Sequence, residues 1–351
     1  MRFLCFGAGA IGSYVGGSLQ LAGNEVVFVE PAQQKSRIQV RGIQIEDVSG
    51  AIHNIPDPEI TSDALAVIRE QSFDAAILAV KSFDTKELIA SLKPVAELLP
   101  PFISLQNGVE NEKELAEIIG EENVIAVSVC TAISRTPTDC IKVEKLRGIG
   151  IEKGKNLSAA LYAEFKKAGL KPELIANGTA MKWSKMLSNL LANASSAILD
   201  MTPAEIYADD SSFELEMLQI REAAAVMNAY DIPVINIPGV PVKLLVWGIR
   251  FLPRPLLKVL LKKQVGSGRG QKMPSFHIDL YAGHHRNEVE FLNGAVVRYA
   301  DAKKIDVPVN RGYYKILTAL AENRLPLDYY RKRPVKLRTN ILFLKNVDKE
   351  K

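Results

Sequence analysis

The stretch GAGAIG at residues 7–12 constrains the fold of this chain more than any other feature of its sequence. It follows a short apolar segment, RFLCF at 2–6, and opens an apolar helical pattern that ends before a second strand-like segment, EVVFVE at 25–30. A GxGxxG pattern between the first strand and the helix of a βαβ unit is typical of dinucleotide-binding domains, whereas the same letters alone are weak evidence. This context therefore predicts a Rossmann-type dinucleotide-binding unit.

Each glycine of this turn has a separate physical role. Gly7 permits the tight turn, Gly9 lets the backbone approach a pyrophosphate, and Gly12 lets helix and strand pack closely. The anion is then stabilised by the N–H groups and the dipole at the helix N-terminus. The alternative is a glycine-rich turn without a ligand. The cofactor-binding residues that we expect here are Gly7, Gly9, Ala10, Ile11 and Gly12.

Glu30 ends the second predicted strand, where an acidic side chain can accept hydrogen bonds from the adenosine ribose hydroxyl groups. A carboxylate at this position repels a 2′-phosphate, so Glu30 favours NADH over NADPH. Lys35 and Arg37 follow closely. We interpret them as part of a solvated helix face, with phosphate binding as the alternative.

Three further apolar segments predict strands at 73–81, 102–108 and 123–134, with helical patterns at 84–99 and 110–119 between them. Strands that alternate with helices form a parallel sheet covered by helices on both faces. The first half of the chain is therefore expected to be the sheet domain of an α/β protein.

Polar residues follow two of these strands. Lys81 comes directly after AILAV, and Asn107 lies in the QNG sequence after FISL. Ligands of parallel α/β sheets bind beyond the carboxyl ends of the strands. We therefore expect Lys81 and Asn107 to be site residues, although each segment also has a simpler interpretation as the start of a loop.

The second half of the chain lacks strand patterns. Its helical patterns cover 180–199, 211–230, 288–303 and 309–323. We expect an all-helical domain behind the sheet domain, with a ligand cleft between them. The expected division is a Rossmann domain at 1–176, a helical domain at 177–330 with an insertion at 236–272, and a basic C-terminal tail at 331–351.

One predicted helix carries an unusual polar line. In KMLSNLLANASSAIL at 185–199, the residues Lys185, Asn189 and Asn193 recur every four positions and span an arc of about 80° on a helix. Burying a lysine without a partner is costly, so the line is expected to face an enclosed polar cavity. Lys182 lies on nearly the same side and is an alternative for any lysine role. The other interpretation is a helix edge from which Lys185 extends into solvent.

Composition excludes several classes of function. The formal net charge of +4 is spread along the chain without a basic stripe, so we expect no nucleic-acid partner. The four histidines lack a metal-ligand rhythm, so we expect no metal site. Three scattered cysteines predict reduced thiols and a cytoplasmic location.

The apolar segment at 242–263 is interrupted by Arg250, Arg254 and prolines, so it does not fit a single transmembrane helix. We expect a helical insertion packed on the body of the protein. Peripheral contact with a membrane is the alternative.

Six motifs, in this order, resemble the ketopantoate reductase family over most of the chain. They are GAGAIG at 7–12, AVKSFDT at 79–85, LQNGVEN at 105–111, KMLSNLLANASSAIL at 185–199, PSFHIDL at 274–280 and NEVEFLNG at 287–294. The resemblance implies a Rossmann domain followed by a helical domain. It also implies reduction of a small α-keto acid, 2-dehydropantoate (ketopantoate), usually with NADPH, on the route to pantothenate and coenzyme A.

The resemblance also implies residue roles. Lys185 would be the catalytic acid, Asn189 and Asn193 would line the substrate site, and Ser275 would contact the substrate. Glu288 would be a catalytic carboxylate that opens the NEVEFLNG helix, and Lys81 and Asn107 would stand near cofactor and substrate.

Three departures from the family pattern leave alternatives open. The 236–272 insertion is long, the spacing between Asp279 and Glu288 is one residue longer than usual, and Glu30 argues against NADPH. The alternatives are a reductase of another small α-keto acid, such as a β-hydroxyacid or opine-type dehydrogenase, and a non-enzymatic dinucleotide sensor. A homodimer would fit any of the enzymes.

Overall fold

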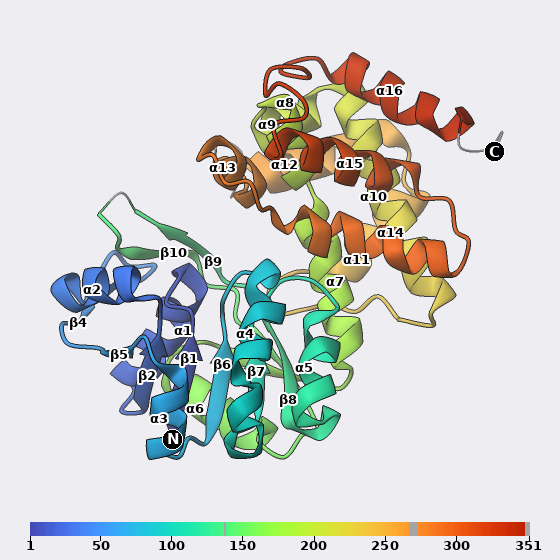
Figure 1. The fold of residues 1–351 in the computed structure, drawn as a ribbon. Helices are drawn as coiled ribbons and strands as arrows, with labels where there is room; N and C mark the ends of the chain where they lie inside the picture. The colour runs from blue at the N-terminus through green and yellow to red at the C-terminus, as the bar shows by residue number, and fades with distance from the viewer. Residues whose placement is uncertain (137, 267–271, 348–351) are drawn as a thin grey trace. The chain divides into compact units, whose positions relative to one another are not determined.

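The structure is a computed structural model that describes residues 1–136, 138–266 and 272–347 (Figure 1). The chain divides into two compact units. The first comprises Met1–Lys182 with Ile237–Val240, and the second comprises Trp183–Asn236 with Pro241–Lys351. The division falls inside helix α7 (Gly178–Leu190), whose first turn belongs to the first unit.

The first unit contains an eight-stranded sheet in the order β12-β11-β8-β7-β6-β1-β2-β5. Its strands are β1 Arg2–Phe6, β2 Glu25–Val29, β5 Glu59–Thr61, β6 Ala75–Leu78, β7 Phe102–Ser104, β8 Val124–Val129, β11 Ile149–Glu152 and β12 Pro172–Ile175. The neighbouring strands β5, β2, β1, β6, β7 and β8 all pair in parallel. This confirms the predicted Rossmann-type sheet. Strand β11 is antiparallel to β8, which the alternation of strands and helices did not predict.

Both faces of the sheet are buried, and β1 shows why. Successive side chains of a strand point to opposite faces. Phe3 and Cys5 pack with apolar residues of α1 (Ala10–Leu21) and α6 (Ser158–Lys167). Leu4 and Phe6 pack with apolar residues of α3 (Ala64–Glu70), α4 (Thr85–Leu92) and α5 (Asn111–Ile119). A strand that is apolar at every position after Arg2 therefore fits the centre of a sheet with helices on both sides.

A second, four-stranded sheet in the order β4-β3-β10-β9 also belongs to this unit. Its strands are β3 Ile43–Glu46, β4 Ile52–Ile55, β9 Ala132–Arg135 and β10 Ile141–Lys145. The prediction of one strand at 123–134 is wrong, because β8 and β9 belong to different sheets. The chain leaves the large sheet at Cys130 and Thr131, whose N–H groups both donate to the carbonyl of Gly148 (3.0 and 3.2 Å).

The described residues of the second unit form helices and the loops that join them, without a strand among them, as predicted. Beyond the shared α7, its helices are α8 Asn193–Leu199, α9 Pro203–Ala208, α10 Asp210–Ala229, α11 Val242–Phe251, α12 Arg254–Gly266, α13 Ser275–Tyr281, α14 Asn293–Ala302, α15 Pro308–Ala321 and α16 Pro334–Val347. Two predicted helices are interrupted. The one at 180–199 breaks between α7 and α8, and the one at 288–303 begins as a short 3-10 helix, η4 Glu288–Phe291, before α14.

The segment at 331–351 was predicted to be a C-terminal tail, but its described residues form a packed helix. Helix α16 packs on α10 and α15, and its Leu337 and Ile341 are fully buried. Gly312 of α15 allows the close approach, since a Cβ there would stand 2.7 Å from the Ile341 side chain. An apolar contact of this kind fixes the helix in spite of its basic residues.

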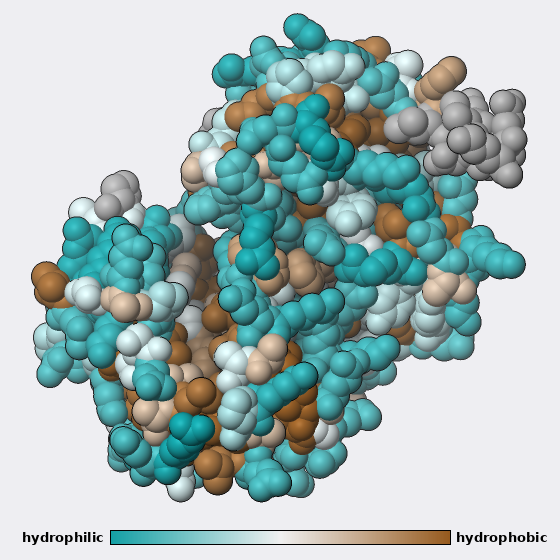
Figure 2. All heavy atoms as spheres, in the orientation of Figure 1, coloured by the Kyte–Doolittle hydropathy of each residue, from teal (hydrophilic) through white to brown (hydrophobic). Residues whose placement is uncertain are grey.

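The 236–272 insertion forms α11 and α12 within its described residues. Helix α11 buries Val242 and Ile249 but exposes Leu244, Trp247 and Phe251. No described helix is both long and apolar enough to cross a membrane. In the view of Figure 2, hydrophilic residues cover most of the visible surface and apolar patches are smaller.

Candidate active site

The glycine turn has the geometry that its sequence predicts. Gly7 has φ +96°, and a Cβ there would lie 2.9 Å from the backbone of Ala79 and Val80. A Cβ on Gly12 would lie 1.8 Å from the carbonyl oxygen of Gly7. A Cβ on Gly9 would meet no atom within 4 Å, so the backbone here lies open to an approaching group.

The N-terminus of α1 begins directly after this turn. Among the described residues, no side chain caps the helix, and its first turn, which starts with Ala10, Ile11 and Gly12, carries no acidic residue. Helix N–H groups without an intrahelical partner bind anions. This end of α1 therefore fits the pyrophosphate of a dinucleotide.

Glu30 lies directly after β2, and its carboxylate accepts a hydrogen bond from the N–H of Ala8. Burial raises the pKa of Glu30 above its ordinary value, and the Ala8 hydrogen bond and the charge of Arg135 oppose this shift. Glu30 thus lies beside the glycine turn, where the sequence placed a ribose-binding carboxylate.

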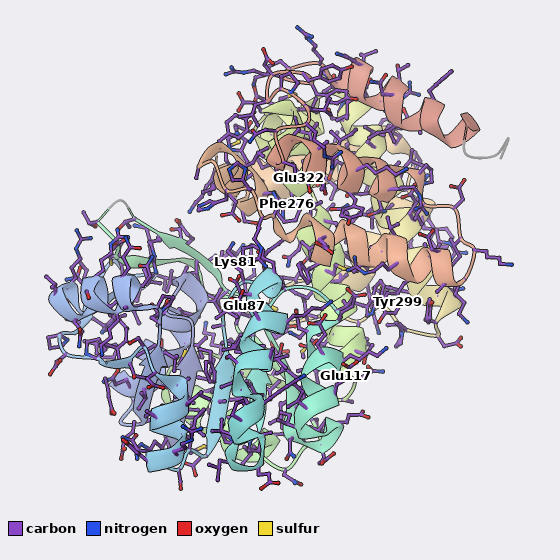
Figure 3. The ribbon with its side chains drawn as sticks, in the orientation of Figure 1. Lys81, Glu87, Glu117, Phe276, Tyr299 and Glu322 are labelled. Carbon is purple, nitrogen blue, oxygen red and sulfur yellow. The ribbon has the colours of Figure 1, made fainter. Side chains whose placement is uncertain are left out.

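The loops after β6 and β7 are joined by hydrogen bonds. The hydroxyl of Ser82 donates to the carbonyl of Asn107 (2.9 Å), and the side chain of Gln106 donates to the carbonyl of Val80 (2.8 Å). Asn111 also donates to the Asn107 carbonyl (2.8 Å). Lys81 is exposed and lies at the N-terminal side of α4 (Figure 3). The structure therefore brings the Lys81 and Asn107 loops together at the carboxyl ends of neighbouring strands.

Lys182, the alternative lysine, is held within the first unit. Its Nζ donates to the carbonyls of Ser104 (3.0 Å) and Gln106 (2.9 Å) and forms an ion pair with Glu112 (2.7 Å). The side chain is only 4% exposed. These partners offset the cost of burying the charge, and they indicate a structural role that attaches α7 to the loop after β7.

Lys185 and Asn189 lie on one side of α7, as predicted. Lys185 Nζ donates to Asn189 Oδ1 at 3.1 Å, and both side chains are half-buried. Asn193, however, does not continue the same helical line. Helix α7 ends at Leu190, and Ala192 adopts a left-handed conformation (φ +54°) before α8 begins at Asn193. The prediction of one straight polar stripe is therefore wrong.

The break gives Asn193 a different partner. Asn193 is buried, and its Oδ1 accepts a hydrogen bond from the N–H of Phe276 (3.1 Å), in the first turn of α13. Ser275 is the first residue of α13 and is exposed. Phe276, which is labelled in Figure 3, packs in the apolar interior. Asn193 thus orients the helix that begins with Ser275.

Helix α10 supports the break with buried polar side chains that were not predicted from the sequence. The N–H of Ala192 donates to Glu216 Oε2 (2.5 Å), and Gln219 donates to the carbonyl of Leu190 (3.2 Å). Tyr313 donates to the other Glu216 oxygen (3.4 Å). In the sequence, Glu216 stands out as a polar residue on an otherwise apolar helix face. Its partner, Ala192, lies too far away along the chain to be identified from residue spacing.

Glu216→Gln is expected to remove a pH-dependent loss of stability. Burial raises the pKa of Glu216 to about 7 in the folded protein, above its unfolded value near 4.3. Stability therefore falls as pH rises between these values, because the folded state holds the proton more tightly. Urea unfolding measures the free energy of unfolding of both proteins at pH 5 and at pH 8. Between these pH values, the wild-type value should fall by about 3 kcal/mol more than the value of the variant. A difference between the proteins that does not change with pH would contradict this prediction.

Glu288 is buried at the start of η4, and the preceding Asn287 accepts a hydrogen bond from the N–H of Val289 (2.8 Å). The residues between Asp279 and Glu288 complete α13 and form the loop that follows it. Among the described residues, no cluster of His, Cys, Asp and Glu side chains is arranged to hold a metal ion.

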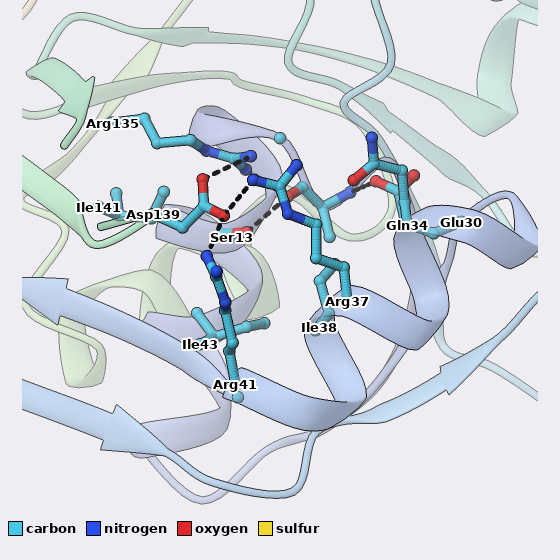
Figure 4. A pocket seen from close by; sticks show the side chains of 13 residues that line it. Ser13, Glu30, Gln34, Arg37, Ile38, Arg41, Ile43, Arg135, Asp139 and Ile141 are labelled. Carbon is cyan, nitrogen blue, oxygen red and sulfur yellow. Dashed lines mark hydrogen bonds and ion pairs between the residues drawn. The ribbon is translucent and has the colours of Figure 1, made fainter. Parts of the chain in front are cut away.

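A cavity of about 190 Å³ lies beside the glycine turn (Figure 4). The residues that line it are Ala8, Gly9, Ser13, Glu30, Gln34, Arg37, Ile38, Arg41, Gly42, Ile43, Arg135, Asp139 and Ile141. Arg37 lines this pocket although its side chain is 52% exposed, so it lies on a solvated helix face, as predicted, and also borders the cavity. Arg135 and Asp139, on β9 and the turn after it, were not anticipated because that turn is distant in sequence from the glycines.

Two family models match the chain in sequence. One, described as Ketopantoate reductase PanE/ApbA, matches residues 3–151, and its C-terminal counterpart matches residues 177–321. The 2-dehydropantoate 2-reductase of Pyrococcus horikoshii is 28% identical over 319 residues, which cover 88% of this chain and 94% of that protein. The enzyme of the same name from Aquifex aeolicus is 25% identical, with 91% and 96% covered.

Solved structures show the same fold. A PanE/ApbA family ketopantoate reductase from Ralstonia eutropha has a TM-score of 0.76 and 26% identity, with 92% of this chain and 99% of that chain covered. A D-mandelate dehydrogenase solved with NADH and anilino(oxo)acetate has a TM-score of 0.75 at 20% identity and the same coverage. With both family models matched in order and the predicted motifs in place, this chain belongs to the ketopantoate reductase family, whose members are NAD(P)H-dependent oxidoreductases.

Proposed function

We propose that this protein reduces 2-dehydropantoate to pantoate with NAD(P)H, in the synthesis of pantothenate and coenzyme A. The observation that carries the proposal is the Lys185–Asn189 hydrogen bond on α7, within a motif that matches the family. The two sequence relatives, both 2-dehydropantoate 2-reductases matched over about nine-tenths of the chain, support the same substrate.

The glycine turn is the proposed dinucleotide site. The open backbone at Gly9 and the N-terminus of α1 fit the pyrophosphate, and Glu30 lies beside them for the adenosine ribose. Lys81 and Asn107, on loops joined at the carboxyl edge of the sheet, are proposed to contact the cofactor and the substrate. Bound NAD(P)H supplies the hydride that the keto carbon accepts.

Lys185 is the proposed catalytic acid. As the keto carbon accepts hydride, negative charge develops on the carbonyl oxygen, and the Lys185 ammonium stabilises that oxygen and donates a proton to it. Hydride and proton together convert the ketone to the alcohol. Because Asn189 Oδ1 holds one N–H of the ammonium, the charge is oriented before substrate binds.

The substrate-binding groups are proposed to be neutral. Asn189, Asn193 and Ser275 can hold the carboxylate and hydroxyl of a small keto acid without bringing a second charge near Lys185. Asn193 acts on this site by orienting the first turn of α13, where Ser275 lies. Glu288 is proposed to be the catalytic carboxylate that accepts a hydrogen bond from the lysine or from the substrate hydroxyl.

The location of the reaction is also a proposal. Cys5, Cys130 and Cys140 are all buried and unbonded to one another. Reduced thiols of this kind fit the cytoplasm, where disulfides are rare. We propose that the enzyme acts there.

The direct test is the oxidation of NADPH and NADH, followed by absorbance, with 2-dehydropantoate and with a panel of other small α-keto acids. We expect the highest kcat/KM for 2-dehydropantoate. Preferential turnover of another keto acid would move the assignment to a different dehydrogenase of this family. No turnover of any keto acid with either coenzyme would contradict the proposal.

A further inference from the structure

The cavity beside Glu30 contains a charged cluster that the proposed reaction does not use. Arg37 and Arg41 lie one turn apart on α2 (Ala32–Arg41), and Arg135 ends β9. All three guanidinium groups approach the carboxylate of Asp139 (Figure 4). The distances to it are 2.7 Å from Arg37, 2.8 Å from Arg41 and 3.8 Å from Arg135.

The cluster is attached to the glycine turn. Arg135 Nη2 donates to the carbonyl of Ala8 at 3.0 Å, and the hydroxyl of Ser13 donates to the same oxygen at 2.8 Å. In a dinucleotide-binding βαβ unit, the adenosine ribose lies between the glycine turn and the end of the second strand. The guanidinium groups therefore stand near the expected position of the ribose 2′ oxygen.

Three converging guanidinium groups are a typical phosphate site, because each offers planar N–H donors and a permanent charge. Here the carboxylate of Asp139 already occupies the anion position between the three guanidinium groups. Since Asp139 is covalently tethered, its effective concentration at the arginines is high, and an incoming phosphate has to compete with it. Glu30 adds a second negative charge to the same cavity.

We propose that Asp139 is a specificity-determining residue for the coenzyme, and that its carboxylate occupies the anion site of Arg37, Arg41 and Arg135 and so favours NADH over NADPH. The inference rests on the proposed function, because it concerns the dinucleotide of that reaction. A 2′-phosphate must displace Asp139 and leave its carboxylate beside a second anion, whereas a 2′-hydroxyl makes no such demand.

Asn is the informative replacement for Asp139. The residue has φ +63°, and its N–H donates to the carbonyl of Thr136 (2.9 Å) in the turn between β9 and β10. Aspartate and asparagine both tolerate the left-handed conformation. Asp139→Asn therefore removes the charge and keeps the backbone of the turn.

The experiment is calorimetric titration of the full chain with NADPH and with NADH. In Asp139→Asn we expect the Kd for NADPH to fall at least tenfold and the Kd for NADH to change less than threefold. Adding Arg37→Ala to this variant should reverse the gain. Glu97→Gln is the matched control, because it removes one negative charge from an exposed position of the same unit, on the 3-10 helix η2 (Lys93–Leu98). It should leave both values unchanged.

An equal change for both coenzymes in Asp139→Asn, or no change, would overturn the inference. So would a wild-type protein that already binds NADPH at least tenfold more tightly than NADH. Binding of the coenzymes as expected, without turnover of any keto acid, would overturn the proposed function and leave the role of Asp139 standing. A wild-type protein that binds neither coenzyme would overturn both.

Discussion

Replacing Lys185 with alanine is expected to lower kcat for keto-acid reduction by about 10²–10⁴-fold, the usual contribution of a positioned acid. The variant loses both the charge that stabilises the developing alkoxide and the proton that the alkoxide accepts. The Kd for the coenzyme should change little, because the glycine turn belongs to the other unit. Steady-state assays at saturating coenzyme, with separate coenzyme titrations, measure both quantities.

Lys182→Ala provides the contrast on the same helix. Its ammonium holds the carbonyls of Ser104 and Gln106 and pairs with Glu112, so its loss leaves buried acceptors without a donor. We expect a lower Tm, because removing one partner of a buried ion pair typically costs about 3–5 kcal/mol of stability. If Lys185→Ala kept full turnover and Lys182→Ala lost it at unchanged Tm, the acid would be Lys182 and our assignment would be wrong.

Gly12→Ala is expected to abolish detectable coenzyme binding and to destabilise the fold. The added Cβ would lie 1.8 Å from the Gly7 carbonyl oxygen and 3.1 Å from the Ala79 side chain. The Gly7 backbone cannot move away without displacing α1 from the sheet, so the cost should exceed the roughly 1–3 kcal/mol that is typical of overpacking. Thermal unfolding and calorimetric titration with NADH and NADPH test the two effects together.

Gly9→Ala separates binding from folding. Gly9 has φ −66°, which alanine adopts readily, and its added Cβ meets no atom within 4 Å. The variant should keep the wild-type Tm and still lose at least tenfold in coenzyme affinity, because the methyl group stands where the pyrophosphate approaches. Wild-type affinity in both glycine variants would show that the dinucleotide binds elsewhere.

The features that sequence predicts well here are local ones. The turn from β1 into α1 requires glycines at fixed offsets within six residues, so GAGAIG indicates both the backbone and the ligand. Central strands such as β1 and β6 are apolar at nearly every position because both of their faces are covered. The helical half follows from apolar periodicity alone.

The features that sequence missed depend on distant partners. The α7–α8 break has no glycine or proline, and Ala192 holds its left-handed conformation through Glu216, far along the chain on α10. Lys182 and Lys185 lie on one face of α7. The sequence does not show that the Lys182 ammonium donates to backbone carbonyls of the first unit. The arginine cluster assembles from α2 and the β9–β10 turn, which no short motif connects.

The hairpin of β9 and β10 has an evolutionary consequence. Asp139 lies in the turn between β9 and β10, and its own side chain belongs to neither hydrophobic core cluster. By our proposal, Asp139→Asn keeps the backbone of the turn and changes which cellular pool of reducing equivalents the enzyme draws upon. If Asp139 sets the coenzyme preference as we propose, a single codon change in this turn is enough to move a lineage between catabolic and biosynthetic electron supplies.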